Sequence, residues 1–145
     1  MDLTKAARFM HLASTLATLS KDQHKQVGCI LLDPDTLFIK SSGYNGFPIN
    51  IQDDPERWQK ENKSMYVQHA EMNAICSAAR HGTPLDKSLC IVTYHPCSTC
   101  AKALIQAGIK QIITLPPDYT HPRWGNEFER ATNLFKEANI EITLI

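Results

Sequence analysis

Apolar residues recur at two different spacings along the chain, and the two spacings alternate with each other. Spacings of three and four residues, typical of helices with one buried face, predict helices over residues 4–19, 67–79, 97–107 and 126–138. Short apolar or alternating runs, typical of strands, cover residues 27–32, 37–45, 89–94, 109–115 and 140–145. This succession predicts an α/β protein in which helices cover a mixed sheet of about five strands.

The segment from residue 47 to residue 66 follows neither spacing clearly. Within it, Asp53 to Trp58 has an acidic start and a proline at a position that the first turn of a helix tolerates. We therefore expect a short helix there, without a defined end.

Length and composition set the scale of the fold. With 145 residues, of which 43% are hydrophobic, the chain suffices for one core and is too short for two ordinary domains. We therefore expect residues 1–145 to form a single domain. The 15 basic and 15 acidic residues cancel, which argues against nucleic acids and anionic membranes as partners and leaves a small molecule as the expected substrate.

The expected compartment is the cytoplasm. No run approaches the roughly 18 consecutive apolar residues of a membrane span, and the first residues lack the layout of a signal peptide. Five cysteines in such a chain favour metal binding or free thiols over a disulfide framework. Because Cys29, Cys76 and Cys90 lie in apolar runs, we expect these three in the core.

Two short stretches, His69-Ala70-Glu71 and Pro96-Cys97-Ser98-Thr99-Cys100, carry the residue types of a zinc enzyme. One imidazole and two thiolates are three zinc ligands, and a fourth position without a protein ligand is what a catalytic zinc requires. His69 and Glu71 fall at the predicted start of one helix, and the two cysteines fall at the start of another. Glu71 would then act as an acid/base group and not as a ligand.

Three plainer interpretations of these residues remain open. Cys97 and Cys100 could form a redox pair, and His69 could simply cap its helix. Cys90 or His95 could supply a fourth ligand and close the site as a structural zinc. A purely structural site, however, has no use for a carboxylate at position 71.

Further motifs accompany the zinc signature: Val27-Gly28, Gly43-Tyr44-Asn45-Gly46-Phe47-Pro48, His69-Ala70-Glu71-Met72-Asn73-Ala74-Ile75, and Cys100-Ala101-Lys102 through Gln106-Ala107-Gly108-Ile109-Lys110. With them, the sequence resembles the deoxycytidylate (dCMP) deaminases of the zinc-dependent cytidine and deoxycytidylate deaminase superfamily. The resemblance extends from about Ser20 to Tyr119. It implies a three-layer α/β/α fold of the cytidine deaminase type, a single CMP/dCMP-type deaminase domain and a homohexamer.

The resemblance also implies a reaction, the hydrolysis of dCMP to dUMP and ammonia, which feeds thymidylate synthesis. One zinc ion per chain, held by His69, Cys97 and Cys100, would supply the hydroxide that attacks C4 of cytosine. Glu71 would shuttle protons from water to N3 and later to the departing amine. A deaminase of dCTP, cytidine or deoxycytidine is the nearest alternative, and a catalytically silent, zinc-stabilised interaction module is a more distant one.

Contacts to the substrate are implied as well. Asn45 matches a position that hydrogen-bonds the sugar and base region, although it could instead be a turn asparagine in the left-handed conformation. The backbone N–H of Ala70 would bind the pyrimidine carbonyl, and Tyr119 matches a tyrosine that closes over the nucleotide. For the 5′-phosphate, the loop before the first strand offers Ser20, Lys21 and Lys25. A solvated loop without a ligand is the alternative for that stretch.

Regulation is the final implication. In regulated members of this family, dCTP activates and dTTP inhibits near a subunit interface. Arg80 matches an arginine tied to that regulation, and Mg²⁺ would accompany the effector nucleotides. Ser77, however, stands where some members carry larger side chains, and residues 47–66 lack the ligands that some members use for a second zinc. Nothing in the sequence accounts for His95.

Overall fold

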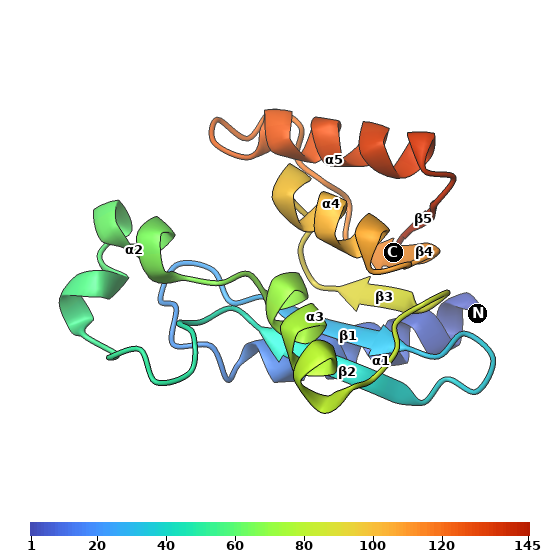
Figure 1. The fold of residues 1–145 in the computed structure, drawn as a ribbon. Helices are drawn as coiled ribbons and strands as arrows, with labels where there is room; N and C mark the ends of the chain where they lie inside the picture. Colours follow the sequence, from blue (N-terminus) through green and yellow to red (C-terminus); the bar gives the residue numbers. More distant parts are fainter.

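The computed structural model describes all 145 residues, and a mixed five-stranded sheet lies at its centre (Figure 1). Its strands follow the order β2-β1-β3-β4-β5. β1 is antiparallel to both of its neighbours, whereas β3, β4 and β5 are parallel to one another. The strands are β1 (Gly28–Leu32), β2 (Ile39–Tyr44), β3 (Leu89–Val92), β4 (Gln111–Thr114) and β5 (Glu141–Leu144).

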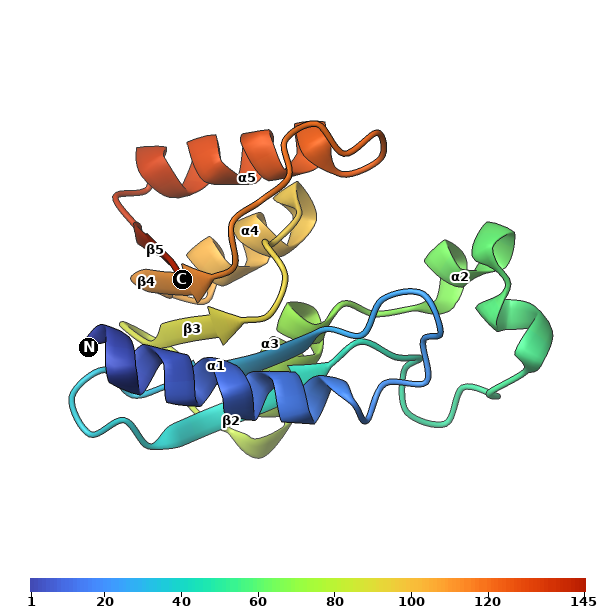
Figure 2. The ribbon, with the colours of Figure 1, turned by 180° about the vertical axis from the view of Figure 1, so that it is seen from behind.

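Helices cover both faces of this sheet, which confirms the predicted three-layer α/β/α arrangement. Helix α1 (Leu3–Ala17) packs on one face and lies in front of the sheet in Figure 2. The opposite face is covered by α3 (Ala70–His81), α4 (Ser98–Gln106) and α5 (Gly125–Glu137). None of the helices combines the length and apolar character needed to cross a bilayer.

Strand β1 shows why a continuous apolar run marks a central strand. Successive side chains of a strand point to opposite faces. Ile30 and Leu32 accordingly pack with α1, whereas Cys29 and Leu31 pack with α3 and α4. All four are buried, and each aliphatic side chain contributes roughly 1.5–3 kcal/mol through its burial.

A close contact between β2 and α3 fixes where α3 begins. A Cβ atom added to Gly43 would lie 2.4 Å from the carbonyl oxygen of Ala70 and 2.5 Å from the backbone nitrogen of Ala74. Only glycine permits this approach of strand and helix. The residue immediately before α3, His69, is thereby held at a defined place beside the sheet.

Two predictions made from the sequence need correction. Residues 47–66 form a 3₁₀ helix (Pro55–Trp58) and also α2 (Lys60–Tyr66), which the apolar pattern did not indicate because no residue of this segment is buried. Cys29 and Cys90 do lie in the core, with their sulfurs 3.6 Å apart. Cys76, in contrast, is exposed, because it lies on the face of α3 opposite its buried alanines.

Candidate active site

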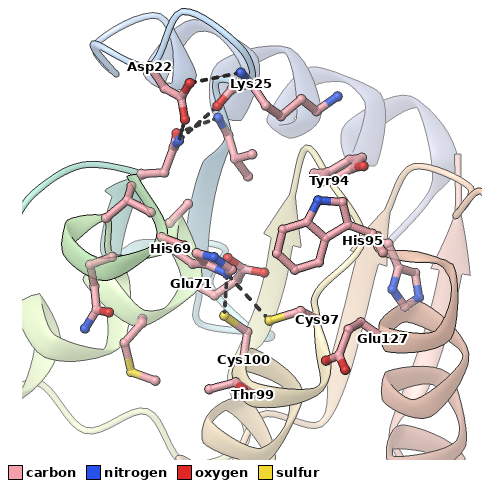
Figure 3. A pocket seen from close by; sticks show the side chains of 18 of the residues that line it. Asp22, Lys25, His69, Glu71, Tyr94, His95, Cys97, Thr99, Cys100 and Glu127 are labelled. Carbon is pink, nitrogen blue, oxygen red and sulfur yellow. Dashed lines mark hydrogen bonds between the residues drawn. The ribbon is translucent and has the colours of Figure 1, made fainter. Parts of the chain in front are cut away.

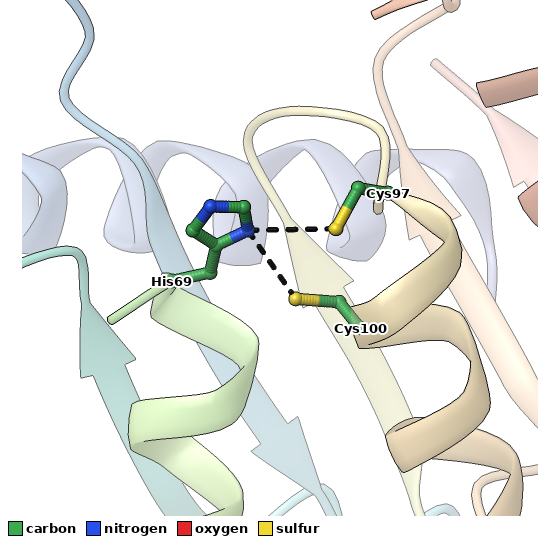
Figure 4. Close-up of side chains that lie close together, drawn as sticks. All are labelled: His69, Cys97 and Cys100. Atoms are coloured by element: carbon green, nitrogen blue, oxygen red, sulfur yellow. Dashed lines mark hydrogen bonds between the residues drawn. The ribbon is translucent and has the colours of Figure 1, made fainter. Parts of the chain in front are cut away.

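The N-termini of α3 and α4 meet at a cluster of one histidine and two cysteines (Figure 4). His69 is the N-cap residue of α3, Cys97 is the N-cap residue of α4, and Cys100 lies in the first turn of α4. Nδ1 of His69 lies 3.5 Å from Sγ of Cys97 and 3.5 Å from Sγ of Cys100. Residues that are far apart in sequence therefore present three ligand atoms to one point.

The spacing of these atoms fits a zinc ion. Zinc binds sulfur at about 2.3 Å and imidazole nitrogen at about 2.0 Å, so two such ligands at a tetrahedral angle lie about 3.5 Å apart. The three ligand atoms all lie within 4.8 Å of one another. The donor set and its dimensions thus match a three-ligand zinc site.

The competing interpretations of these residues lose support from the same geometry. His69 occupies the N-cap position of α3, but its side chain makes no hydrogen bond to the backbone of the helix, so capping is not the role of the imidazole. The two candidates for a fourth ligand have other partners: Sγ of Cys90 lies beside Cys29, and the His95 ring nitrogens face the Pro96 carbonyl and Thr132. The redox interpretation gives no role to His69, which contacts both sulfurs.

Protonation of the cluster reflects the two sulfurs lying close together. A hydrogen bond from Cys100 is the main reason that the pKa of the Cys97 thiol falls to about 4. The same contact raises the pKa of Cys100, because two thiolates side by side repel each other. The hydrogen bond with Cys97 also raises the pKa of His69. The cluster therefore gathers negative charge at Cys97, which suits a cationic ligand.

Glu71 lies one residue inside α3 and is 4% exposed. Burial is the main reason that its pKa rises from an ordinary value of 4.5 to about 7, against the opposing effect of His69. A carboxyl group with a pKa near 7 can both accept and donate a proton at neutral pH. Figure 3 shows its side chain beside His69 and close to both cysteines.

A cavity of about 390 Å³ opens over this cluster and is lined by 21 residues (Figure 3). This volume is typical of sites for small molecules. The lining includes the three ligand residues and Glu71. The rest comes from the segments before β1, after β2 and after β3, from α2 and the residues between α2 and α3, from the first turns of α3 and α4, and from the residues just before and at the beginning of α5.

Asp22 anchors one wall of this cavity. Its side chain is almost completely buried and receives hydrogen bonds from Nζ of Lys63 at 2.8 Å and from Nδ2 of Asn45 at 3.2 Å. Burial alone would raise the pKa of Asp22, but hydrogen bonds from Lys63 and from the backbone N–H groups of His24 and Lys25 outweigh it and hold the pKa below its ordinary value. The charge of Asp22 thus ties α2 to the loop before β1.

Comparison with known proteins places the chain in a family. Residues 3–115 match the family described as the cytidine and deoxycytidylate deaminase zinc-binding region. The chain belongs to this family. It is 45% identical over 118 residues to a probable deoxycytidylate deaminase of Caenorhabditis elegans. The aligned region covers 79% of this chain and 58% of that protein. It is also 36% identical over 138 residues to the human deoxycytidylate deaminase, and this aligned region covers 91% of this chain and 74% of that protein.

Membership of the family agrees with the fold. A crystal structure of the dCMP deaminase from cyanophage S-TIM5, in complex with dCMP and dUMP, superimposes with a TM-score of 0.82 at 22% identity. The match covers 100% of this chain and 99% of that chain, and it confirms the predicted fold class. The chain spans little more than half, 58%, of the length of the Caenorhabditis elegans relative.

The residues expected to contact substrate fall into two groups. Asn45, Ala70 and Lys25 line the cavity. Asn45 has an ordinary backbone conformation and not a left-handed one, and its side chain joins the loop before β1 to the end of β2 by bonding the Val27 N–H and the Lys25 carbonyl.

The other group lies outside the cavity. Ser20 is buried and accepts a hydrogen bond from the Asp22 N–H, and Lys21 forms an ion pair with Asp53. The Tyr119 hydroxyl lies 3.1 Å from Oγ1 of Thr132. Arg80 is exposed in the last turn of α3, at the far end of the helix from His69.

Several residues of the cavity lining escaped prediction from the sequence. They are mostly charged or aromatic: Lys63, Tyr94, Arg123, Trp124 and Glu127. Trp124 lies edge-on to His69, with ring centroids 5.9 Å apart, and the Arg123 guanidinium stacks over the Trp124 ring at 4.9 Å. The sequence does show an adjacent arginine and tryptophan, Arg123 and Trp124, just before a predicted helix. The spacing of apolar residues, however, does not indicate that these two side chains lie near His69 and the two cysteines.

Proposed function

We propose that this protein is a zinc-dependent deaminase that hydrolyses dCMP to dUMP and ammonia. In this reaction a C–O bond forms at C4 of the cytosine, the C4–N bond breaks, and the amino group leaves as ammonia. The proposal is supported by family membership and by relatives described as deoxycytidylate deaminases.

The observation that carries the proposal is a buried carboxyl group beside a three-ligand metal site. Glu71 lies two residues after His69, inside the cavity, and its pKa of about 7 suits proton transfer in both directions. It would take a proton from the attacking water, deliver it to N3, and later protonate the departing amine. A site that only stabilised the fold would not need a carboxyl group that is costly to bury.

The remaining residues would bind and orient the nucleotide around this group. His69, Cys97 and Cys100 would hold a zinc ion, which would supply Lewis acidity and lower the pKa of water to near neutrality. The N–H of Ala70, in the first turn of α3, has no acceptor within the helix and would bind the pyrimidine carbonyl. Asn45 would contact the sugar from the wall that its hydrogen bonds hold in place.

The phosphate would lie near the cavity cations that have no carboxylate partner. Lys25 places Nζ over the Tyr94 ring at 4.1 Å, and Arg123 stacks on Trp124. Lys63 is less available because it pairs with Asp22. A monophosphate would thus meet Lys25 and Arg123 and not the predicted Ser20 and Lys21.

Ammonia release from dCMP, dCTP, CMP, cytidine and deoxycytidine tests the proposal. The wild-type protein should prefer dCMP, and Glu71→Gln should lower kcat by about 10²–10⁴-fold, the usual contribution of a proton-transferring group. Zinc content should stay unchanged, and Glu137→Gln, at an exposed position on α5, is the matched control. Full activity of Glu71→Gln, or a clear preference for another cytosine compound, would contradict the proposal.

We further propose that residues 1–145 form a single catalytic domain that assembles into a homo-oligomer, with six copies as the expected number. Exposed apolar side chains on and just after α1 and at the beginning of β2 support self-association; they include Leu12, Leu19, Phe38 and Ile39. The free thiols at Cys97 and Cys100 suit the reducing cytoplasm. Light scattering at micromolar concentration checks the assembly, and a monomeric mass would contradict it.

A further inference from the structure

A buried histidine stands directly before the proline that begins the cysteine motif. His95 is 3% exposed, and its ring lies edge-on to the Phe128 ring with centroids 5.4 Å apart. In Figure 3 the ring points away from His69, toward α5. His95 borders the cavity, but its two ring nitrogens face the Pro96 carbonyl and Thr132, so neither is turned toward the metal ligands or the substrate base. An apolar side chain would fill the same space without burying polar atoms.

Both ring nitrogens of His95 have polar partners. Nδ1 lies 3.0 Å from the Pro96 carbonyl oxygen, which can only accept, so Nδ1 carries the proton. In the neutral ring Nε2 is then an acceptor, and it lies 3.3 Å from Oγ1 of Thr132. The Thr132 hydroxyl has one proton, which goes either to Nε2 or to the Phe128 carbonyl oxygen at 2.9 Å, and its oxygen can accept from the Tyr119 hydroxyl at 3.1 Å. A chain of polar contacts thus runs from Tyr119 to the peptide that precedes Cys97.

The loop at the outer end of this chain is held by several backbone hydrogen bonds. His121 accepts hydrogen bonds at Nδ1 from the backbone N–H groups of Arg123 and Trp124, at 3.1 and 3.0 Å. The N–H of Gly125 donates to the His121 carbonyl at 2.8 Å, and a Cβ atom on Gly125 would lie 2.2 Å from the carbonyl oxygen of Tyr119. These contacts join the two ends of the loop, which carries Arg123 and Trp124 into the cavity.

We propose that His95 is a positioning residue that fixes the peptide before Cys97 and, through Thr132 and Tyr119, couples it to the loop that carries Arg123 and Trp124. The metal-ligand end of α4 and the nucleotide wall before α5 would then keep a constant distance. A displacement of the loop would shift Cys97, and a displacement of Cys97 would shift the loop. The kinetic part of this inference rests on the proposed deaminase function, whereas its metal-binding part does not.

The test removes the central hydroxyl and keeps its shape. Thr132→Val should raise KM for dCMP several-fold, because the loop with Trp124 loses its attachment, while kcat changes less. Zinc transfer from the loaded protein to a chromogenic chelator should become several-fold faster. Thr132→Ser, which restores the hydroxyl, should return both values to those of the wild type. Tyr119→Phe removes only the outer contact, so it should raise KM and leave the rate of zinc transfer unchanged.

Each outcome decides for or against the coupling. Wild-type KM and wild-type zinc transfer in Thr132→Val, with the thermal midpoint unchanged, would overturn it. Equal effects in Thr132→Val and Thr132→Ser would also overturn it, because the hydroxyl would then not be the cause. If Thr132→Val does not fold, Tyr119→Phe at its half-exposed position decides by its KM. If the wild-type protein does not deaminate dCMP, the proposed function fails, and zinc transfer alone still decides the coupling.

Discussion

Replacing Glu71 by glutamine should stabilise the metal-free protein in a manner that depends on pH. The unfolded chain loses the Glu71 proton near pH 4.5, whereas the folded chain retains it until about pH 7, because burial disfavours the carboxylate. Between these values the unfolded state binds fewer protons than the folded state. The stability of the wild-type protein therefore falls as pH rises through this window and is then constant. Glutamine has no proton to lose and escapes this loss.

The size of the effect follows from the two pKa values. The rise from 4.5 to about 7 corresponds to roughly 3 kcal/mol in the free energy of unfolding, at about 1.4 kcal/mol for each pH unit. Because Glu71 is only 4% exposed, solvent screening reduces this figure little. Most of the advantage of Glu71→Gln over the wild type should therefore appear above pH 7, and little of it below pH 4.5.

Urea unfolding of chelator-treated protein at pH 5 and at pH 8.5 measures this advantage. The wild type and Glu71→Gln share their other titrating groups, so the change in their difference between the two pH values reports on Glu71 together with its effect on the pKa of His69 and Cys100. Glu137→Gln, in the exposed last turn of α5, should show no such change. A difference between the wild type and Glu71→Gln that does not depend on pH would refute the link between burial, pKa and stability at this position.

Three further predictions concern the walls of the cavity and its regulation. Asp22→Asn should lower the free energy of unfolding at pH 7 by about 1–3 kcal/mol, since Asp22 accepts a charged hydrogen bond from Lys63. The pKa of Asp22 is held below its ordinary value, so the wild type loses this stabilisation as pH falls through that pKa. Urea unfolding at several pH values should therefore show the difference between the two proteins becoming smaller at low pH. Trp124→Ala should raise KM for dCMP at least tenfold and Trp124→Phe less, as steady-state kinetics would show, and equal KM values would exclude the ring as a wall. Arg80→Ala should abolish any activation by dCTP with Mg²⁺ and leave basal activity intact, and activity titrations that show retained activation would contradict its regulatory role.

The clustering of the three candidate zinc ligands and the helices that carry them could be predicted because local signals determine them. Pro96 ends the segment after β3, Cys97 and Cys100 are spaced for one helical turn, and His69 immediately precedes an alanine-rich helix. Such signals depend on neighbours in sequence. The same local reasoning located the central strands, since a sheet buried on both faces leaves continuous apolar runs.

The walls of the cavity could not be predicted in this way, because they depend on the paths of irregular segments. Lys63 reaches the cavity from α2, a helix with no buried residue and hence no apolar period to reveal it. Lys21 is predicted as a phosphate ligand from its loop, and its ion pair with Asp53, 32 residues away, has no signal among its neighbours in sequence. Tyr119 and Trp124 lie close in sequence, yet only Trp124 lines the cavity, because the tight loop before α5 directs the two side chains differently.

The absence of any buried residue from 47 to 66 has a consequence for how this protein can be cut and altered. Opening residues 47–66, here called the arm, would expose little apolar surface and break few contacts with the rest of the chain, chiefly the ion pairs Lys63–Asp22 and Lys21–Asp53 and the adjoining bridge between Gly46 and Gln68. A protease should therefore nick the native protein here first, long before the layers separate. Insertions at the arm would add only a small loop-closure cost, so the chain can change length at the rim of its cavity while the zinc ligands stay in place.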